Sequence, residues 1–299
     1  MSERSEGRID KAELRASRTA VLVCQARAVA DGRVAVGRFA DPIARQLLHV
    51  DERAAVELAR GNVPRRWQDR IEFEFLAATA DVLAARTVAI DDAVREVQNP
   101  QLVVLGAGLD ARGWRMPELA GVRLFEVDQP ASQRDKCTRL GELAPTAKSV
   151  RFVPVEFGRD ALGAALNSAE HDRTRPTTWI WEGVLPYLTH HQSNSTLAEI
   201  AACSAGGSRL IATYSNRLPI PGAGRLALRI LFGIARRTNP MSHERHVSAW
   251  RQEQMRELLG AHGWRVVSDV DQLTLAQGLA IPVRRPQTLA NGRVVVADC

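Results

Sequence analysis

The chain has 299 residues, of which 45% are hydrophobic and 25% charged, a balance typical of a soluble globular enzyme. No apolar run approaches the roughly 18 residues that a bilayer-spanning helix needs, and the charged N-terminal stretch lacks the apolar core of a signal peptide. The four cysteines are scattered without metal-ligand spacing, which favours free thiols in a reducing compartment. We therefore expect a cytoplasmic protein with no membrane partner and no metal site.

The formal net charge of +6 raises the question of nucleic-acid binding. The arginines, however, are spread along the chain and interleaved with acids, as in Glu13-Leu14-Arg15 and Arg256-Glu257. Aromatic residues make up only 5% of the chain, which leaves little material for stacking on bases. We expect a small-molecule partner and no nucleic acid, and the sequence does not indicate the oligomeric state.

Residues 10–97 have a helical pattern, with apolar side chains at helical spacing in Trp67, Ile71, Phe75 and Ala78. Asp41-Pro42 has the form of a helix start, with the aspartate as N-cap and the proline at the first helical position. The sequence therefore predicts an N-terminal helical segment, residues 1–98, that packs on a core formed by residues 99–299.

From residue 99 onward, short apolar runs alternate with helical stretches, which predicts right-handed βαβ units and a parallel sheet in an α/β fold. The runs span residues 102–106, 122–128, 150–155, 177–181 and 208–214, and the main helical stretches span 129–143 and 190–204. Two later runs, 264–270 and 292–298, have no regular helix between them, so we expect them to pair antiparallel at one edge. Residues 216–246 carry prolines and glycines around an apolar helix at 226–235, as expected for a cap insertion after the fifth strand.

The first predicted strand ends in a glycine-rich loop, Gly106-Ala107-Gly108-Leu109-Asp110-Ala111, and Asp128 follows Gly108 by 20 residues at the end of the second strand. Glycines let the backbone turn tightly beneath a ligand, and a carboxylate in that place can accept both hydroxyl groups of a ribose. NAD, FAD and S-adenosylmethionine (SAM) are all compatible with this loop, and so is a purely structural tight turn.

Two features of the loop favour SAM over NAD. Asp110 occupies the place where a helix N-terminus would receive a pyrophosphate, and its charge would repel that anion. SAM has no phosphate and carries an ammonium and a sulfonium group instead. Gly113 and Pro117 also interrupt the helix that a dinucleotide fold requires after this loop.

Several motifs together resemble SAM-dependent methyltransferases similar to leucine carboxyl methyltransferase, in particular the bacterial O-methyltransferase branch linked to polyketide-type metabolism. They occur in the family's order between about residues 17 and 214, and include FADPIA, ARTVAIDD, VVLGAGLDARGWRMP, FEVDQP, VRFVPVEF, WEGVLPYLT and SAGGSRLIATY. The resemblance implies a class I methyltransferase fold with strand order 3-2-1-4-5-7-6 and an antiparallel seventh strand. It also implies SAM as cofactor and O-methylation of a small-molecule carboxylate or hydroxyl.

The resemblance further implies a set of cofactor-binding residues that follows SAM from its amino-acid end to its adenine. They are Arg27, Arg86 and Glu182 at the amino-acid moiety, Gly106 and Gly108 beneath the methionine, Asp128 at the ribose with Gln129 beside it, and Glu156 with Phe157 flanking the adenine. The family usually has Asp-Leu in place of Glu156-Phe157, and a Gly-Glu-Pro turn where this chain has Met241 to His246. The acceptor is therefore less well defined by the sequence than the cofactor.

Four alternatives remain open at this point. Arg86 could pair with Asp81 or Asp91 on its own helix, and Glu182 could cap the helix that follows it. The chain as a whole could be an NAD-dependent oxidoreductase, or a SAM-binding protein without catalysis. No catalytic dyad is defined by spacing, so the catalytic residues stay unassigned.

Overall fold

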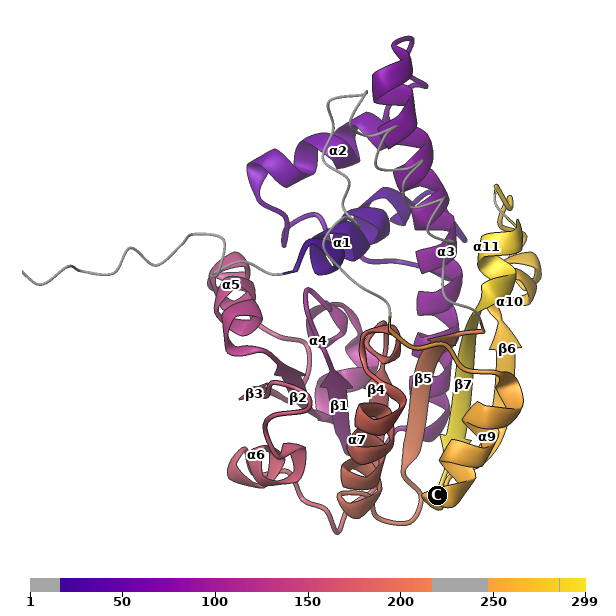
Figure 1. The fold of residues 1–299 in the computed structure, drawn as a ribbon. Helices are drawn as coiled ribbons and strands as arrows, with labels where there is room; N and C mark the ends of the chain where they lie inside the picture. The colour runs from indigo at the N-terminus through magenta and orange to yellow at the C-terminus, as the bar shows by residue number, and fades with distance from the viewer. Residues whose placement is uncertain (1–16, 217–246, 285) are drawn as a thin grey trace, which may run out of the picture.

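The computed structural model describes residues 17–216, 247–284 and 286–299 (Figure 1). The predicted cap insertion therefore lies outside the described residues, apart from Asn216. None of the described helices is both long enough and apolar enough to cross a membrane.

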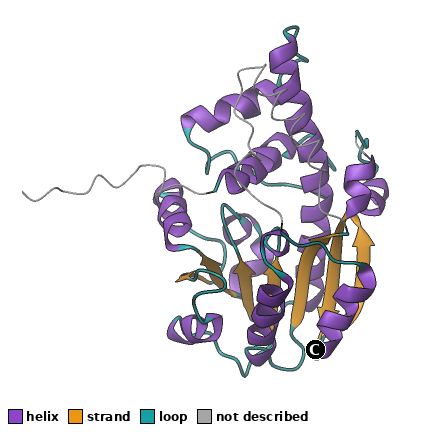
Figure 2. Ribbon diagram, in the orientation of Figure 1, coloured by secondary structure: helices purple, strands orange, loops and turns teal. Residues whose placement is uncertain are grey.

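A seven-stranded sheet in the order β3-β2-β1-β4-β5-β7-β6 forms the centre of the molecule (Figures 1 and 2). The strands are β1 (Gln101–Leu105), β2 (Arg123–Asp128), β3 (Ser149–Pro154), β4 (Thr177–Trp181), β5 (Arg209–Ser215), β6 (Arg265–Asp271) and β7 (Gly292–Asp298). The first five are parallel, and β7 runs antiparallel to both of its neighbours. The predicted α/β class and the strand order implied by the resemblance are both confirmed.

The connection between β6 and β7 differs from the prediction. Two short helices, α10 (Gln272–Gly278) and α11 (Pro286–Asn291), lie between these strands. Asp271 begins α10 as an N-cap, because its carboxylate accepts a hydrogen bond from the backbone of Thr274 at 2.9 Å. The pair is antiparallel as expected, but β7 lies inside the sheet and only β6 is at the edge.

Alternate residues of the central strands point to opposite faces of the sheet. Val103 and Leu105 of β1 share one apolar cluster with the helices α6 (Leu162–Ser168), α7 (His190–Ala202) and α9 (Gln252–Ala261). Leu102 and Val104 belong to a second cluster on the other face, together with the last turns of α3 (Trp67–Val97). β1 is buried along its whole length, as expected for a parallel strand covered on both sides.

The N-terminal helices α1 (Arg18–Ala30) and α2 (Val50–Arg60) lie beyond the end of the sheet to which β1 points, and α3 continues from there along the sheet (Figure 1). Small side chains of α1, such as Cys24 and Ala26, are completely buried and let α1 pack closely on α2 and α3. The same apolar cluster includes Leu109 and Ala111 from the loop after β1, so the helical segment packs on the core at that loop. The division at residue 98 stays a prediction.

Asp41 does not begin a helix, so this prediction was wrong. The residues after Asp41 form successive turns, and its carboxylate accepts a hydrogen bond from the backbone of Ala44 at 3.0 Å. Asp41 is completely buried, and its other oxygen lies 3.3 Å from Nε of Arg27. The buried guanidinium takes the carboxylate of Asp41 as its partner, and the chain turns around this ion pair.

Glu126 of β2 forms a buried ion pair with Lys136 of α5 (Pro130–Leu140). Nζ and Oε2 lie 2.5 Å apart, and each side chain is only 1% exposed. Burial raises the pKa of Glu126 to about 7, although Lys136 opposes the shift.

This pKa predicts how stability depends on pH. The folded protein retains the proton of Glu126 up to about pH 7, whereas the unfolded chain loses it near pH 4.5, so the folded state loses stability as the pH rises from about 4.5 to about 7. Between pH 5 and pH 8, the free energy of unfolding of the wild-type protein should fall by about 2 kcal/mol more than that of the double variant Glu126→Gln/Lys136→Met. Urea denaturation at both pH values measures the difference, and parallel losses in the two proteins would contradict the assignment.

Candidate functional site

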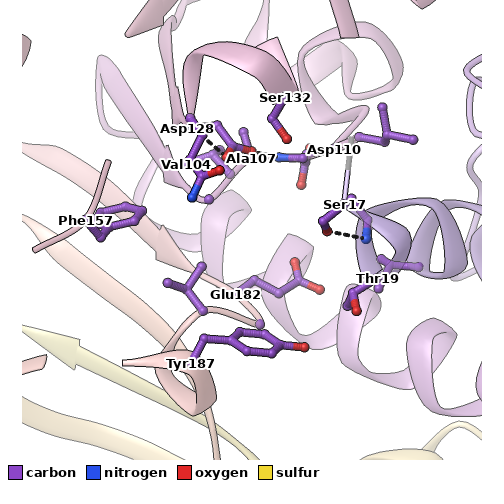
Figure 3. A pocket seen from close by; sticks show the side chains of 18 of the residues that line it. Ser17, Thr19, Val104, Ala107, Asp110, Asp128, Ser132, Phe157, Glu182 and Tyr187 are labelled. Atoms are coloured by element: carbon purple, nitrogen blue, oxygen red, sulfur yellow. Dashed lines mark hydrogen bonds between the residues drawn. The ribbon is translucent and has the colours of Figure 1, made fainter. Parts of the chain in front are cut away.

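A cavity of about 670 Å³ opens at the carboxyl ends of β1, β2 and β4 (Figure 3). β1 lies between β2 and β4, so the cavity occupies the point in the sheet where the strand order reverses. Open α/β sheets bind their ligands in this crevice. Residues of α1, α3 and α7 complete the lining, which makes the N-terminal helices part of the site.

Two glycines of the loop after β1 allow the cavity walls to approach each other. Gly106 and Gly108 have φ angles of +66° and +49°, which side chains rarely adopt. A Cβ atom at Gly106 would collide with Cγ2 of Val184, and one at Gly108 would lie 3.0 Å from Cβ of Ala20. The loop therefore meets both the chain after β4 and the first turn of α1, and a ligand can lie against bare backbone.

Asp128 extends from the end of β2 into the cavity (Figure 3). Its Oδ2 accepts a hydrogen bond from the backbone N–H of Gly108 at 2.6 Å, and its Oδ1 accepts one from Gln129 at 2.7 Å. Burial raises its pKa, while these two hydrogen bonds oppose the shift. A carboxylate has about four acceptor positions, so two remain available for hydroxyl groups of a ligand.

Arg86 of α3 and Glu182, which follows β4, form an ion pair at another part of the cavity lining. Nη2 of Arg86 lies 2.7 Å from Oε1 of Glu182, and Nε donates to the same oxygen at 2.8 Å. The alternative pairing of Arg86 with Asp81 or Asp91 is wrong, because Asp81 pairs with Arg284 and Asp91 lies among other arginines.

Glu182 does not serve as a helix cap either. Its second oxygen, Oε2, lies 3.0 Å from Nη1 of Arg112, a completely buried residue that does not line the cavity. Arg112 also contacts Asp110 and, at 2.7 Å, Asp91. One guanidinium thus joins a residue of α3, the glycine loop and the chain after β4.

These contacts continue into what we call the ionic network. Arg115 contacts Asp91 at 2.7 Å and lies 3.6 Å from Asp41, the partner of Arg27. Arg27 also donates to the backbone carbonyl of Leu109. The network consists of four arginines and four carboxylates, namely Arg27, Arg86, Arg112, Arg115, Asp41, Asp91, Asp110 and Glu182.

The arginines keep Asp91, Asp110 and Glu182 ionised despite their burial. Burial alone would raise the pKa of Asp110, but the guanidinium groups of Arg112 and Arg27 hold it below its usual range. Burial likewise opposes ionisation of Glu182, and Arg86 together with Arg112 lowers its pKa. The cavity therefore presents permanent charges of both signs.

Of the residues that the resemblance implied, all but one line the cavity. The exception is Glu156, whose side chain is 43% exposed and accepts a hydrogen bond from Arg159 at 2.8 Å. Its neighbour Phe157 does line the cavity.

Sequence reasoning missed Arg112 and Arg115, which support the site from behind. They belong to the motif VVLGAGLDARGWRMP, where two arginines within a largely apolar stretch indicate buried charges that need acidic partners. It also missed Gln192, which lines the cavity from α7.

Removing Arg112 should destabilise the fold. The variant Arg112→Met leaves Asp91, Asp110 and Glu182 with fewer counter-charges in the interior, which typically costs about 3–5 kcal/mol. Arg151→Met is the control, because the ion pair of Arg151 with Glu170 is exposed and such pairs contribute about 0–1 kcal/mol. Equal urea midpoints for the two variants would show that the network contributes no more than a surface pair.

Comparison with known proteins identifies the family. Residues 20–201 match the leucine carboxyl methyltransferase family profile. A Mycobacterium avium (strain 104) protein, provisionally named an S-adenosyl-L-methionine-dependent methyltransferase, is 36% identical over 214 residues, 68% of this chain and 67% of the relative. A protein of the same name from Mycobacterium sp. (strain JLS) is 36% identical over 198 residues, 66% of this chain and 65% of the relative. The chain thus spans about two thirds of the length of these relatives.

The fold is also shared with a solved structure. A protein from Thermobifida fusca YX, provisionally named a methyltransferase, has a crystal structure that aligns with this chain with a TM-score of 0.57. The alignment covers 95% of each chain at 16% sequence identity. This likeness shows the fold alone, whereas the profile match and the relatives show the family and its cofactor, SAM. The chain belongs to the leucine carboxyl methyltransferase family of SAM-dependent methyltransferases.

Proposed function

We propose that the protein transfers the methyl group of SAM to an oxygen atom of a small-molecule carboxylate or hydroxyl compound, with SAM in the cavity described above. The observation that carries this placement is Asp128, a carboxylate at the end of β2 that is oriented by two backbone N–H groups and faces the cavity. Its remaining acceptor positions suit the two hydroxyl groups of a ribose.

The other cavity residues fit the remaining parts of SAM. Arg86 and Glu182 offer charges opposite to those of the carboxylate and the ammonium of its amino-acid moiety. Because the ionic network already contains equal numbers of positive and negative groups, a zwitterionic moiety adds no net charge to it. Phe157 offers an aromatic face for the adenine. The cavity volume of about 670 Å³ is ordinary for a small-molecule site.

The acceptor would enter at the end of the cavity away from Phe157. Ser17, Thr19 and Tyr187 lie there, with their hydroxyl groups toward the region of Glu182 (Figure 3). Ser17 is the N-cap of α1, so the positive end of a 13-residue helix is close to this part of the cavity. A helix N-terminus stabilises negative charge, which favours an anionic acceptor.

SAM supplies a methyl group that is activated by the adjoining positive sulfur. The residues of the chain then have to align the acceptor oxygen and exclude water. No histidine is among the described residues of the lining, and its acids are already bound to arginines or to backbone N–H groups. A carboxylate acceptor is ionised at neutral pH and needs no base, so this arrangement favours carboxylates and acidic hydroxyl groups.

Methyl transfer from SAM labelled in its methyl group tests the proposal. The acceptor panel contains small carboxylic acids, phenols, aliphatic alcohols, amines and thiols. We expect labelled product with carboxylic acids or phenols, and mild base distinguishes a labile methyl ester from a stable ether. Transfer only to nitrogen or sulfur, or SAM binding without turnover on any acceptor, would contradict O-methylation.

Replacing Asp128 should weaken cofactor binding strongly. The variant Asp128→Ala loses two charge-assisted hydrogen bonds to the ribose, so we expect the affinity for S-adenosylhomocysteine to fall by roughly a hundredfold. Isothermal titration, corrected for the folded fraction, measures it. Asp172→Ala is the control, because Asp172 does not line the cavity and accepts hydrogen bonds from Thr174 in the turn before β4. Unchanged affinity in folded Asp128→Ala would place the ribose elsewhere.

A further inference from the structure

The proposed placement of SAM leaves the polar edge of the adenine without an obvious partner beside Phe157. The carboxylate of Glu156 is directed to Arg159. The backbone N–H of Glu156 is also used, because it donates to Oδ2 of Asp160 at 2.8 Å. The backbone N–H of Glu156 is therefore already used, and its side chain does not line the cavity that contains Phe157.

Gln192 brings a different polar group to this part of the cavity. It is the third residue of α7 and closes a capping box with Thr189, whose hydroxyl accepts a hydrogen bond from the backbone N–H of Gln192 at 3.2 Å. In return, Oε1 of Gln192 accepts from the backbone N–H and the hydroxyl of Thr189, at 2.9 and 3.0 Å. Because a backbone N–H can only donate, the box fixes which end of the amide is oxygen.

The other end of that amide, Nε2, is a donor without a described acceptor. No described residue forms a hydrogen bond with it, although Gln192 lines the cavity together with Phe157. The side chain cannot turn freely, since its oxygen is bound on two sides.

Gly158 shows how close the amide lies to the loop after β3. Gly158 follows Phe157 and has a φ of +82°, and a Cβ atom added to it would lie 2.6 Å from Nε2 of Gln192. Any other residue at position 158 would push the amide away. Nε2 is therefore held beside the residue that follows the aromatic ring.

We propose that Gln192 recognises the adenine of SAM, with Nε2 donating a hydrogen bond to one of the ring nitrogens N1, N3 or N7. These atoms are acceptors on the edge of the base, and the ring nitrogens are the groups that an amide donor can read. The inference rests on the proposed position of SAM, and it assigns to that site a residue that determines specificity for the base.

The variant Gln192→Glu tests this role without removing the capping box. A carboxylate oxygen still accepts from the backbone of Thr189, as in a standard capping box, but the donor toward the cavity is lost. Binding is measured by isothermal titration with S-adenosylhomocysteine and its 1-deaza, 3-deaza and 7-deaza analogues. Gln254→Glu is the matched control, because Gln254 has the same place in the capping box of α9 and does not line the cavity.

We expect Gln192→Glu to bind S-adenosylhomocysteine roughly tenfold more weakly than the wild type, with an unchanged melting temperature. For the deaza analogue that lacks the contacted nitrogen, the difference in affinity between variant and wild type should shrink markedly, because neither protein can then form this hydrogen bond. Gln254→Glu should bind all four ligands as the wild type does.

If Gln192→Glu loses the same affinity for all four ligands, the inference is overturned. The loss would then come from the added negative charge or from a change in structure, and not from a hydrogen bond to one ring nitrogen. Wild-type affinity in Gln192→Glu would overturn it as well. Failure of the wild-type protein itself to bind S-adenosylhomocysteine is a distinct outcome, which would refute the proposed placement of the cofactor.

Discussion

The guanidinium group of Arg112 determines how the parts of the site meet. It is completely buried and contacts carboxylates from three segments, Asp91 on α3, Asp110 in the glycine loop and Glu182 after β4. A charge buried without partners is very costly, so these segments are held where all their charges remain paired. The position of Glu182 in turn fixes Arg86, although Arg112 itself never reaches the cavity.

The same constraint explains why the N-terminal helices belong to the site. The sheet alone supplies the glycine loop, Asp128 and Glu182, which form one side of the cavity. Arg27 and Arg86 come from α1 and α3, and both are paired with acids. The N-terminal segment and the core each contribute two arginines and two acids to the ionic network, and most of the ion pairs cross between them. The apolar contacts of α1 with the loop after β1 also keep the helices in place.

Much of the fold followed from local sequence features, whereas long-range pairing did not. Strand runs that end in glycine or aspartate indicated the sheet and Asp128, because the carboxyl ends of parallel strands meet at one edge. Arg86 was placed by motif, but its partner Glu182 lies 96 residues away and no spacing rule predicts that pair. Glu156 does not line the cavity for a local reason, since Arg159 offers a nearby solvent-exposed partner. The capping box of Gln192 was visible in the sequence, but its relation to Gly158 depends on how α7 packs beside the loop after β3.

The position of β7 has a consequence for folding during synthesis. β6 leaves the ribosome before β7, yet β7 is the only described strand with which β6 pairs. Until β7 has been made, β6 has no place in the sheet, and the edge of β5 that β7 later covers is open to other strands. The nascent chain therefore passes through a stage in which an apolar edge is exposed, and at that stage chaperones would protect it most effectively.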